Sequence, residues 1–533
     1  MKRFYLFIFI SIISAQQIDK IPYDWGGQFG YINKNGSLFW NEDWNSNGLF
    51  FDGTWTNYPR MFGHQIEENF LQKEPYHSQN YRADTSLTTT WFKYDQGDYL
   101  LDRFSMGANY NNKNRQVQFH GFKRSYAGGI YNPYESGSVQ PIQQTYTFSY
   151  LSQKGQDDGG ISIGYFNTHS GIADSTALGL IDNRITTAST FWKRNMGQLV
   201  SNLSLNNFLQ RYDANHSLSI YRGIRYLTRS KIFGGLILTR KDQTVLSASL
   251  EINQRNTRVD TSITVNWIRW NILAEWSKLR LDLGIVSGDD KMEPEIFFEY
   301  KNYFGQLSGS VHFNRSVRPR HVYYNIIQGY PENLFTQNTT IHTEMEWETG
   351  KNHIALFATS TQREIPLLSP DESKIAENIF IGCNYAGNYF LNFQFNLKYS
   401  HQLMKNEISD GIADKIQMNM KNQFQLFNGF MLLDGEIKIT GWLNRDWQMV
   451  MHPIEMIPFD YADTFESLDD IWFVNASLTA NVSTFKVKYE WININEMILA
   501  SLGSLEDNFF EIHPMIPKLG RQVILSVEWH FLN

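Results

Sequence analysis

The chain lacks three features that would assign it to a common protein class. Of its 533 residues only Cys383 is a cysteine, which argues against a disulfide framework and against a lipid anchor on a cysteine near the N-terminus. No stretch approaches the roughly 20 consecutive apolar residues that a membrane-spanning helix needs. Basic residues are not in excess, because the formal net charge is −7 at pH 7, and this composition argues against nucleic-acid binding.

The first residues match the layout of a secretory signal peptide. Lys2 and Arg3 precede an apolar run from Phe4 to Ile13, and Ser14 and Ala15 follow it. A charged start, a short apolar middle and a small-residue end are typical of an exported protein. We therefore expect residues 1–15 to be removed on export.

The remaining chain is polar on average but rich in large apolar side chains. Its mean hydropathy is −0.40, although aromatic residues make up 15% of the sequence. From about residue 82 onward, apolar and polar residues alternate at period two, which is the signal of β-strands. The clearest alternating segments are 246–253, 389–400, 485–491 and 523–531. The sequence therefore predicts an all-β protein.

Three features favour a large antiparallel transmembrane β-barrel over a soluble sandwich. The alternating runs are about ten residues or longer, which suits tilted membrane-spanning strands. Short turns near 349–350, 386–387, 428–429 and 482–483 alternate with long loops near 363–376, 402–413, 443–470 and 495–520. The apolar faces often end in aromatic residues typical of interfacial girdles, namely Trp267, Trp347, Trp442, Trp472 and Trp491. We expect the barrel to occupy residues 81–533.

The expected number of strands is about 22, within a range of roughly 20 to 24, because bacterial barrels take even numbers. Toward the N-terminus the long loops near 128–142 and 169–183 fall out of phase with the later ones, so one strand has escaped the count. We place it between Trp267 and Ile285, because Trp270 to Lys278 does not alternate cleanly. No repeat of fixed period appears, which argues against a propeller or solenoid.

The C-terminal segment carries a resemblance to known families. Gly520 to Phe531 is an alternating strand that ends in Trp529-x-Phe531, with Pro517 upstream. It resembles the closing strand of outer-membrane barrels, most of all those of TonB-dependent transporters and Bacteroidetes-type porins. The resemblance implies an outer-membrane location and recognition of this strand by the barrel-assembly machinery. Leu532 and Asn533 follow the aromatic residue that usually ends such chains.

The resemblance to TonB-dependent transporters does not extend to the N-terminus. Those proteins carry a plug domain of well over a hundred residues, whereas only residues 16–80 precede the first clear strand here. No energy-coupling motif is evident in this segment. We expect residues 16–80 to form a partial plug or the first strands.

Residues 16–80 also contain the one candidate cofactor site. Asp43-Trp44-Asn45-Ser46-Asn47-Gly48 matches the first half of a calcium loop, with Asp43, Asn45, Asn47 and the later Asp52 as candidate ligands. Thr54 stands where such a loop has its bidentate glutamate, and an Asn/Gly-rich turn is the simpler interpretation. The surrounding aromatic residues could stack on sugars, but packing at the barrel mouth is the favoured role. They are Trp25, Phe29, Tyr31, Phe39, Trp40, Trp44, Phe50, Phe51 and Trp55.

The inferred inward faces carry charges of both signs, which indicates a hydrated lumen. They include Glu251, Arg280, Asp282, His312, His342, Glu344, Glu346, Glu348, Lys398, Lys421, Asp434, Glu436, Lys438, Lys486, Lys488 and Glu490. The alternate residues from His342 to Glu348 could hold a metal, although a solvated acidic stripe is the simpler interpretation. Cys383 falls in register with Ile381 and Tyr385, so we expect it to face lipid.

No nucleophile-elbow or metal-hydrolase motif appears, so we expect no enzymatic activity. The sequence favours a porin-like barrel that provides a path for small or medium solutes. The alternative is a receptor or adhesion barrel that binds a ligand or surface polymer without passive conduction. The apolar loop from Trp447 to Leu468 is expected to fold inward as a constriction or to bind an apolar ligand, and packing on neighbouring loops is the simpler interpretation. Expected partners are outer-membrane lipids, the assembly machinery and an unidentified solute.

Overall fold

A computed structural model describes most of the chain from Leu87 onward and three short pieces before it. The described residues are 18–20, 32–34, 37–39, 87–98, 101–125, 142–170, 179–216, 223–240, 244–288, 291–319, 335–366, 373–389, 392–404, 412–446, 449–451, 458–460, 467–502 and 521–532. The candidate calcium ligands Asp43, Asn45, Asn47 and Asp52 lie outside these ranges. So do the aromatic residues of 25–55, apart from Phe39.

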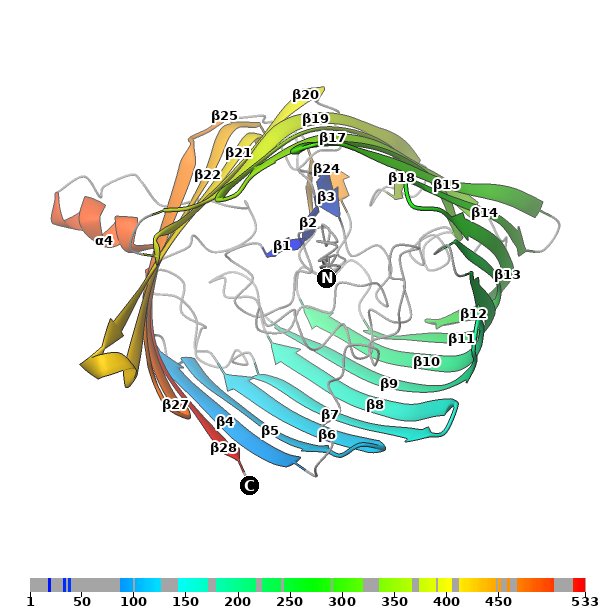
Figure 1. Ribbon diagram of the computed structural model, residues 1–533, viewed down its shortest axis with the longest axis horizontal. Helices are drawn as coiled ribbons and strands as arrows, with labels where there is room; N and C mark the ends of the chain where they lie inside the picture. Colours follow the sequence, from blue (N-terminus) through cyan, green and yellow to red (C-terminus); the bar gives the residue numbers. More distant parts are fainter. Residues whose placement is uncertain are drawn as a thin grey trace, which may run out of the picture.

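The described barrel consists of 22 long strands in one closed antiparallel ring, which confirms the expected architecture and size (Figure 1). The first eleven are β4 (Leu87–Gly97), β5 (Leu101–Asn111), β6 (Arg115–Ser125), β7 (Ile142–Lys154), β8 (Asp157–Ser170), β9 (Gly179–Met196), β10 (Leu199–His216), β11 (Gly223–Thr239), β12 (Val245–Arg258), β13 (Ser262–Glu275) and β14 (Leu279–Gly288). The other eleven are β15 (Lys291–Phe304), β16 (Leu307–Pro319), β17 (Phe335–Thr349), β18 (Asn352–Pro366), β19 (Ser373–Asn388), β20 (Gln394–Met404), β21 (Ile412–Leu426), β22 (Met431–Asp446), β26 (Ile471–Val482), β27 (Phe485–Ile492) and β28 (Gln522–Leu532).

The ring closes where the last strand pairs with the first. β28 is antiparallel to β4, with Trp529 opposite Phe92 and Ile524 opposite Gly97. Each of the other long strands pairs with the next long strand along the chain, so the ring follows the order of the sequence. The two-residue β25 (Ser467–Leu468) pairs with the end of β22 beside β26.

Smaller elements stand apart from the wall. β1 (Ile18–Lys20), β2 (Ile32–Lys34) and β3 (Ser37–Phe39) form their own sheet, and β23 (Met449–Met451) pairs with β24 (Pro458–Asp460). In Figure 1 the strands β1 to β3 and β24 lie within the outline of the ring, whereas helix α4 (Ile494–Ser501) lies outside it. A 3₁₀ turn, η3 (Phe427–Gly429), joins β21 to β22. Among the described residues no helix is long and apolar enough to cross a membrane.

Side chains alternate between the two faces of the wall. On β12, Ile252 is 45% exposed while its neighbour Asn253 is 2% exposed, and the same division recurs around the ring. The exposed apolar side chains share one face, as expected of a surface in contact with lipid, and the charged side chains share the other. With lipid on the apolar face, the charged face lines the lumen, and cross-strand pairs show that neighbouring strands share this face. His312 lies opposite His342, and Lys421 lies opposite Glu436.

The two rims of the barrel differ. The short-turn rim carries turns such as 112–114, 240–244, 350–351, 389–393 and 427–430, and the opposite long-loop rim carries most of the longer connections. β9 and β10 each have 18 residues. At about 3.3 Å per residue and a tilt of about 45° these strands exceed an apolar band of about 25 Å. Asp182 and Arg211, which form a 3.0 Å ion pair on their outward face, belong to the part that projects beyond the bilayer.

Two local expectations need correction and one is confirmed. The turn expected at Ala386-Gly387 is wrong, because β19 continues to Asn388 and the next strand, β20, begins at Gln394. Trp267 and Trp442 do not face lipid. Trp267 is 3% exposed on the inner face of β13, and Trp442 packs against inward Phe473, with ring centroids 5.6 Å apart. The uncounted strand is present where it was expected, since β13 and β14 divide the region from Trp267 to Ile285.

Candidate functional site: the inner wall

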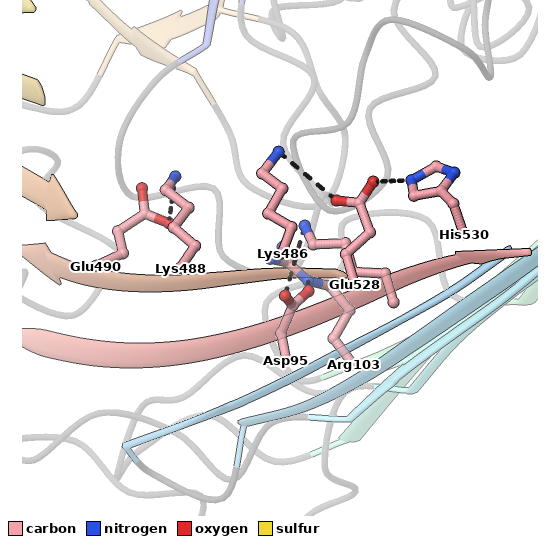
Figure 2. Close-up of polar contacts among 8 residues, drawn as sticks. Asp95, Arg103, Lys486, Lys488, Glu490, Glu528 and His530 are labelled. Carbon is pink, nitrogen blue, oxygen red and sulfur yellow. Dashed lines mark hydrogen bonds and ion pairs between the residues drawn. The ribbon is translucent and has the colours of Figure 1, made fainter. Parts of the chain in front are cut away.

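Ion pairs on the inner face flank the seam at which the barrel wall closes (Figure 2). Lys486 on β27 lies 3.7 Å from Glu528 on β28, and His530 lies 2.5 Å from the same carboxylate. On β4 the buried Asp95 pairs with Arg103 of β5 and lies 3.4 Å from Lys93. Across the seam itself Asp95 lies opposite Ser526 in the ladder between β28 and β4, and this ladder sets the register of the first and last strands.

A second network crosses the inner face from β11 to β15. The carboxylate of Glu251 lies 3.3 Å from Lys231 and 3.4 Å from Arg269. The Nε atom of Arg269 lies 2.9 Å from Glu295, so each buried charge has an opposite charge beside it. Pairing is the condition under which charges are retained in a protein interior.

This network also supplies hydrogen-bond partners where backbone pairing between β15 and β16 is missing. The ladder between β15 and β16 ends at Ile296 and Arg315, next to Pro294, which has no N–H to donate. The backbone N–H of Val317 donates instead to Glu295 at 2.9 Å, and Arg269 donates to the Val317 carbonyl at 3.1 Å. The end of β16 is therefore held by side chains over the inner face of β13 and β15.

An apolar cluster near the long-loop rim packs against the end of β16. Buried Val317 packs with Val265, Trp267 and Val286, and Phe335 at the start of β17 packs against them. At this rim β14 ends at Gly288 and β15 begins at Lys291, so both strands are shorter here than their neighbours. The ends of β16 and β17 at the same rim therefore pack against β13. This contact explains why Trp267 faces inward.

An aromatic row crosses four strands of the inner wall. Phe297 on β15 is followed by His312 on β16, His342 on β17 and Phe357 on β18. The centroids of successive rings are 5.4, 5.7 and 6.1 Å apart. The guanidinium of Arg280 on β14 lies 5.2 Å from the Phe297 ring and extends the row. Sequence patterning identified the two histidines as inward but could not identify the row, because it depends on register between strands.

The acidic stripe on β17 is engaged by neighbouring strands. Glu346 accepts hydrogen bonds from Lys301 at 3.1 Å and Ser308 at 2.9 Å. His342 contacts Thr359 at 2.8 Å through Nδ1, and its Nε2 lies 3.8 Å from Glu344. Within the described part of the chain, no three histidine, cysteine or acidic residues come together in a group that could hold a metal ion. These contacts favour the interpretation of a polar lumen wall.

The apolar loop after β22 is described in part. Met449 to Met451 and Pro458 to Asp460 pair as β23 and β24, away from the barrel sheet. Cys383, which we expected to face lipid, lies opposite the exposed outward residue Leu356, and this confirms its facing.

Comparisons with known proteins find likeness in structure alone. No family model and no curated protein matches the chain. The FrpB iron transporter of Neisseria meningitidis is similar with a TM-score of 0.66 and 10% identity, covering 84% of this chain and 83% of its own. The siderophore receptor PirA of Acinetobacter baumannii gives 0.63 and 8%, covering 85% and 81%. A mutant ferric enterobactin receptor, PfeA of Pseudomonas aeruginosa, solved with enterobactin, gives 0.65 and 9%, covering 85% and 82%. The chain therefore has the fold of an outer-membrane receptor barrel.

Proposed function

We propose that this protein is an outer-membrane receptor that takes up a small ligand through its barrel, and that it is not a porin open to passive diffusion. The observation that carries the proposal is the likeness to an iron transporter and to siderophore receptors over about five sixths of the chain. This likeness favours the receptor alternative over the porin-like path. The role proposed is binding and transfer, without catalysis.

The width of the ring supports an occupied lumen. A ring of 22 strands is too wide to be filled by its own side chains, so water or folded-in segments must occupy its interior. Arg225, Asn253 and Arg255 are all inward and buried. β1 to β3 and β24 also lie within the ring outline (Figure 1). We propose that residues 16–80 act as a partial plug and that the loop after β22 narrows the path.

The inner wall of β11 to β14 supports an anionic ligand. Basic side chains outnumber acidic ones on this sector, where the inward charged residues are Arg225, Arg229, Lys231, Arg255, Arg269 and Arg280 against Glu251, Glu275 and Asp282. A concave wall with one excess sign raises the local concentration of oppositely charged solutes. We propose that this sector attracts the ligand and that the aromatic row beside it contacts flat parts of it.

Two remaining assignments rest on sequence. We propose that the assembly machinery recognises β28, whose outward residues Leu525, Trp529 and Phe531 form an exposed apolar edge beside Phe92. Calcium at Asp43, Asn45, Asn47 and Asp52 stays a proposal, tested by calcium-dependent protection of the N-terminal segment from protease.

The experiment that tests the receptor proposal combines two measurements on one preparation. The purified barrel is reconstituted in planar bilayers, and its intrinsic tryptophan fluorescence is titrated with ferric enterobactin and with other ferric siderophores. A receptor gives saturable quenching with at least one of them and no steady open conductance. A stable channel without saturable binding of any of the chelates would instead support the porin.

A further inference from the structure

We propose that two adjacent hairpin ends on the short-turn rim, at Tyr389 after β19 and at 427–430 between β21 and β22, are immersed in the lipid interface and anchor this side of the barrel in the membrane. The partner is a lipid surface, and the proposal is independent of what passes through the lumen. We call the exposed apolar residues of these turns and their flanks the turn patch. It comprises Tyr389, Phe424, Leu426, Phe427 and Phe430.

The aromatic side chains of the turn patch are largely exposed. Phe427 is 75% exposed and Phe430 is 70% exposed, on either side of Asn428-Gly429. Phe424 and Leu426 continue the exposed surface along β21, and Tyr389 adds to it from the neighbouring hairpin. Exposed apolar patches of several large side chains mark contact with lipid or protein.

The sequence around both turns contains no charge. No Asp, Glu, Lys, Arg or His occurs from Asn378 to Leu397 or from Asn422 to Leu433. Other turns on the same rim do carry charge, such as Lys113 in turn 112–114 and Arg240 at the start of turn 240–244. A charged side chain is costly in the apolar layer, so its absence is a requirement for immersion.

The backbone of the 427–430 turn displays the aromatic side chains at some cost. Phe427 has φ of +52° and Asn428 has φ of +55°. A bulky residue in the left-handed region is strained, and glycine would adopt this conformation freely. Retention of phenylalanine at such a position is consistent with a role for its side chain.

Lipid is favoured over a protein partner because the turn patch continues a surface that already faces lipid. Phe424 shares its face with the outward residues Met420 and Met418 of β21, and Leu433 and Ile437 continue it on β22. Figure 1 shows the end of the β21–β22 hairpin flaring sideways from the ring, in gold at the lower left. A hairpin that leans outward in the plane of the membrane meets lipid before it meets a partner in the water below.

The test measures the depth of spin labels. With Cys383→Ala as the background, which removes the only cysteine, single variants Phe430→Cys and Phe424→Cys are labelled with a nitroxide in phospholipid vesicles. Lys113→Cys, in the charged turn on the same rim, is the matched control. We expect the ratio of oxygen to nickel-chelate collisions to be about tenfold higher at 430 and 424 than at 113, because the polar chelate is excluded from lipid.

Two results would overturn the proposal. Equal access of the nickel chelate to 430 and 113 would place the turn patch in water and favour a periplasmic protein as its partner. A lipid-like ratio at 424 together with a water-like ratio at 430 would limit the lipid contact to the strand and exclude immersion of the turn. Circular dichroism of each labelled protein checks that the barrel has folded, and having two positions on the hairpin keeps the test decisive if one variant misfolds.

Discussion

Arg269 and Glu295 jointly replace the backbone partners that Val317 lacks. The Nε atom of Arg269 lies 2.9 Å from the Glu295 carboxylate. Glu295 accepts a hydrogen bond from the Val317 N–H, and Arg269 donates one to the Val317 carbonyl. The pair thus connects the proline-interrupted wall at β15 to the inward end of β16.

The first prediction follows from this contact. Glu295→Ala removes the partner of a buried arginine and of a buried N–H together, so it should destabilise the barrel by about 3 to 5 kcal/mol. Glu293→Ala is the control, because Glu293 is more exposed and lies 3.9 Å from Arg315. Glu293→Ala should lower the free energy of unfolding by less than about 1 kcal/mol. Urea titration in lipid vesicles measures both, and equal losses would show that the Arg269–Glu295 pair has no special role.

Sequence patterning was most successful where one face of a strand is apolar and the other polar. The alternation along β12 and β27 predicted both the strands and their facing, because lipid and lumen impose opposite requirements on successive residues. It failed at Trp267 and Trp442, because near the long-loop rim the inner face also packs apolar groups such as Val265 and Phe473. Apolar residues on both faces remove the signal.

The parts of the candidate site that sequence did not reveal depend on register. The aromatic row from Phe297 to Phe357 joins residues on four strands, and no pattern within one strand indicates which rings become neighbours. Pro294 was a usable signal, since proline within a strand indicates a break in pairing. It could not indicate that Arg269, from a strand two places away, would help to fill the break.

A second prediction concerns the close packing beside Phe357. Gly382 lies opposite Phe357, and a Cβ at this position would overlap the Tyr399 backbone oxygen and the Phe357 ring. Gly382→Ala should therefore destabilise the barrel by about 1 to 3 kcal/mol. Gly309→Ala, where a Cβ meets nothing within 4 Å, is the matched control and should be nearly neutral. Similar urea midpoints for the two variants would contradict the packing.

The third prediction tests which face meets lipid. Ile232, on the outward face at the middle of β11, is 46% exposed, and Ile232→Lys should cost about 2 to 4 kcal/mol in vesicles. Ser249→Lys on the inward face of neighbouring β12 should cost little. Phe395→Lys should cost only about 1 kcal/mol, because Phe395 is the second residue of β20 and lies near the rim. Equal tolerance of lysine at 232 and 249 would contradict the assigned faces.

The fourth prediction concerns the seam. Asp95 is buried and contacts two cationic side chains, so Asp95→Ala should cost about 3 kcal/mol by leaving Arg103 and Lys93 without it. Lys486→Ala removes a more exposed ion pair with Glu528 and should cost less than about 1 kcal/mol. The temperature at which the folded band disappears on a denaturing gel compares them. If the temperature at which the folded band disappears falls equally in both variants, closure of the barrel does not depend on Asp95.

The last prediction concerns conduction, and it starts from the width of the ring. The lumen of a barrel with 22 strands must hold water or folded-in segments, because its wall side chains cannot fill it. The apolar loop after β22 is the outer connection least suited to solvation, and its strands β23 and β24 pair with each other away from the wall. Deleting Met449 to Phe459 should raise single-channel conductance in planar bilayers and leave the β-sheet circular dichroism unchanged. A second variant lacks both the loop and residues 16–80. If the N-terminal segment and the loop both block the lumen, conductance rises fully only in this double deletion. Conductance that stays at the wild-type value in the loop deletion and in the double deletion would exclude this loop as the constriction.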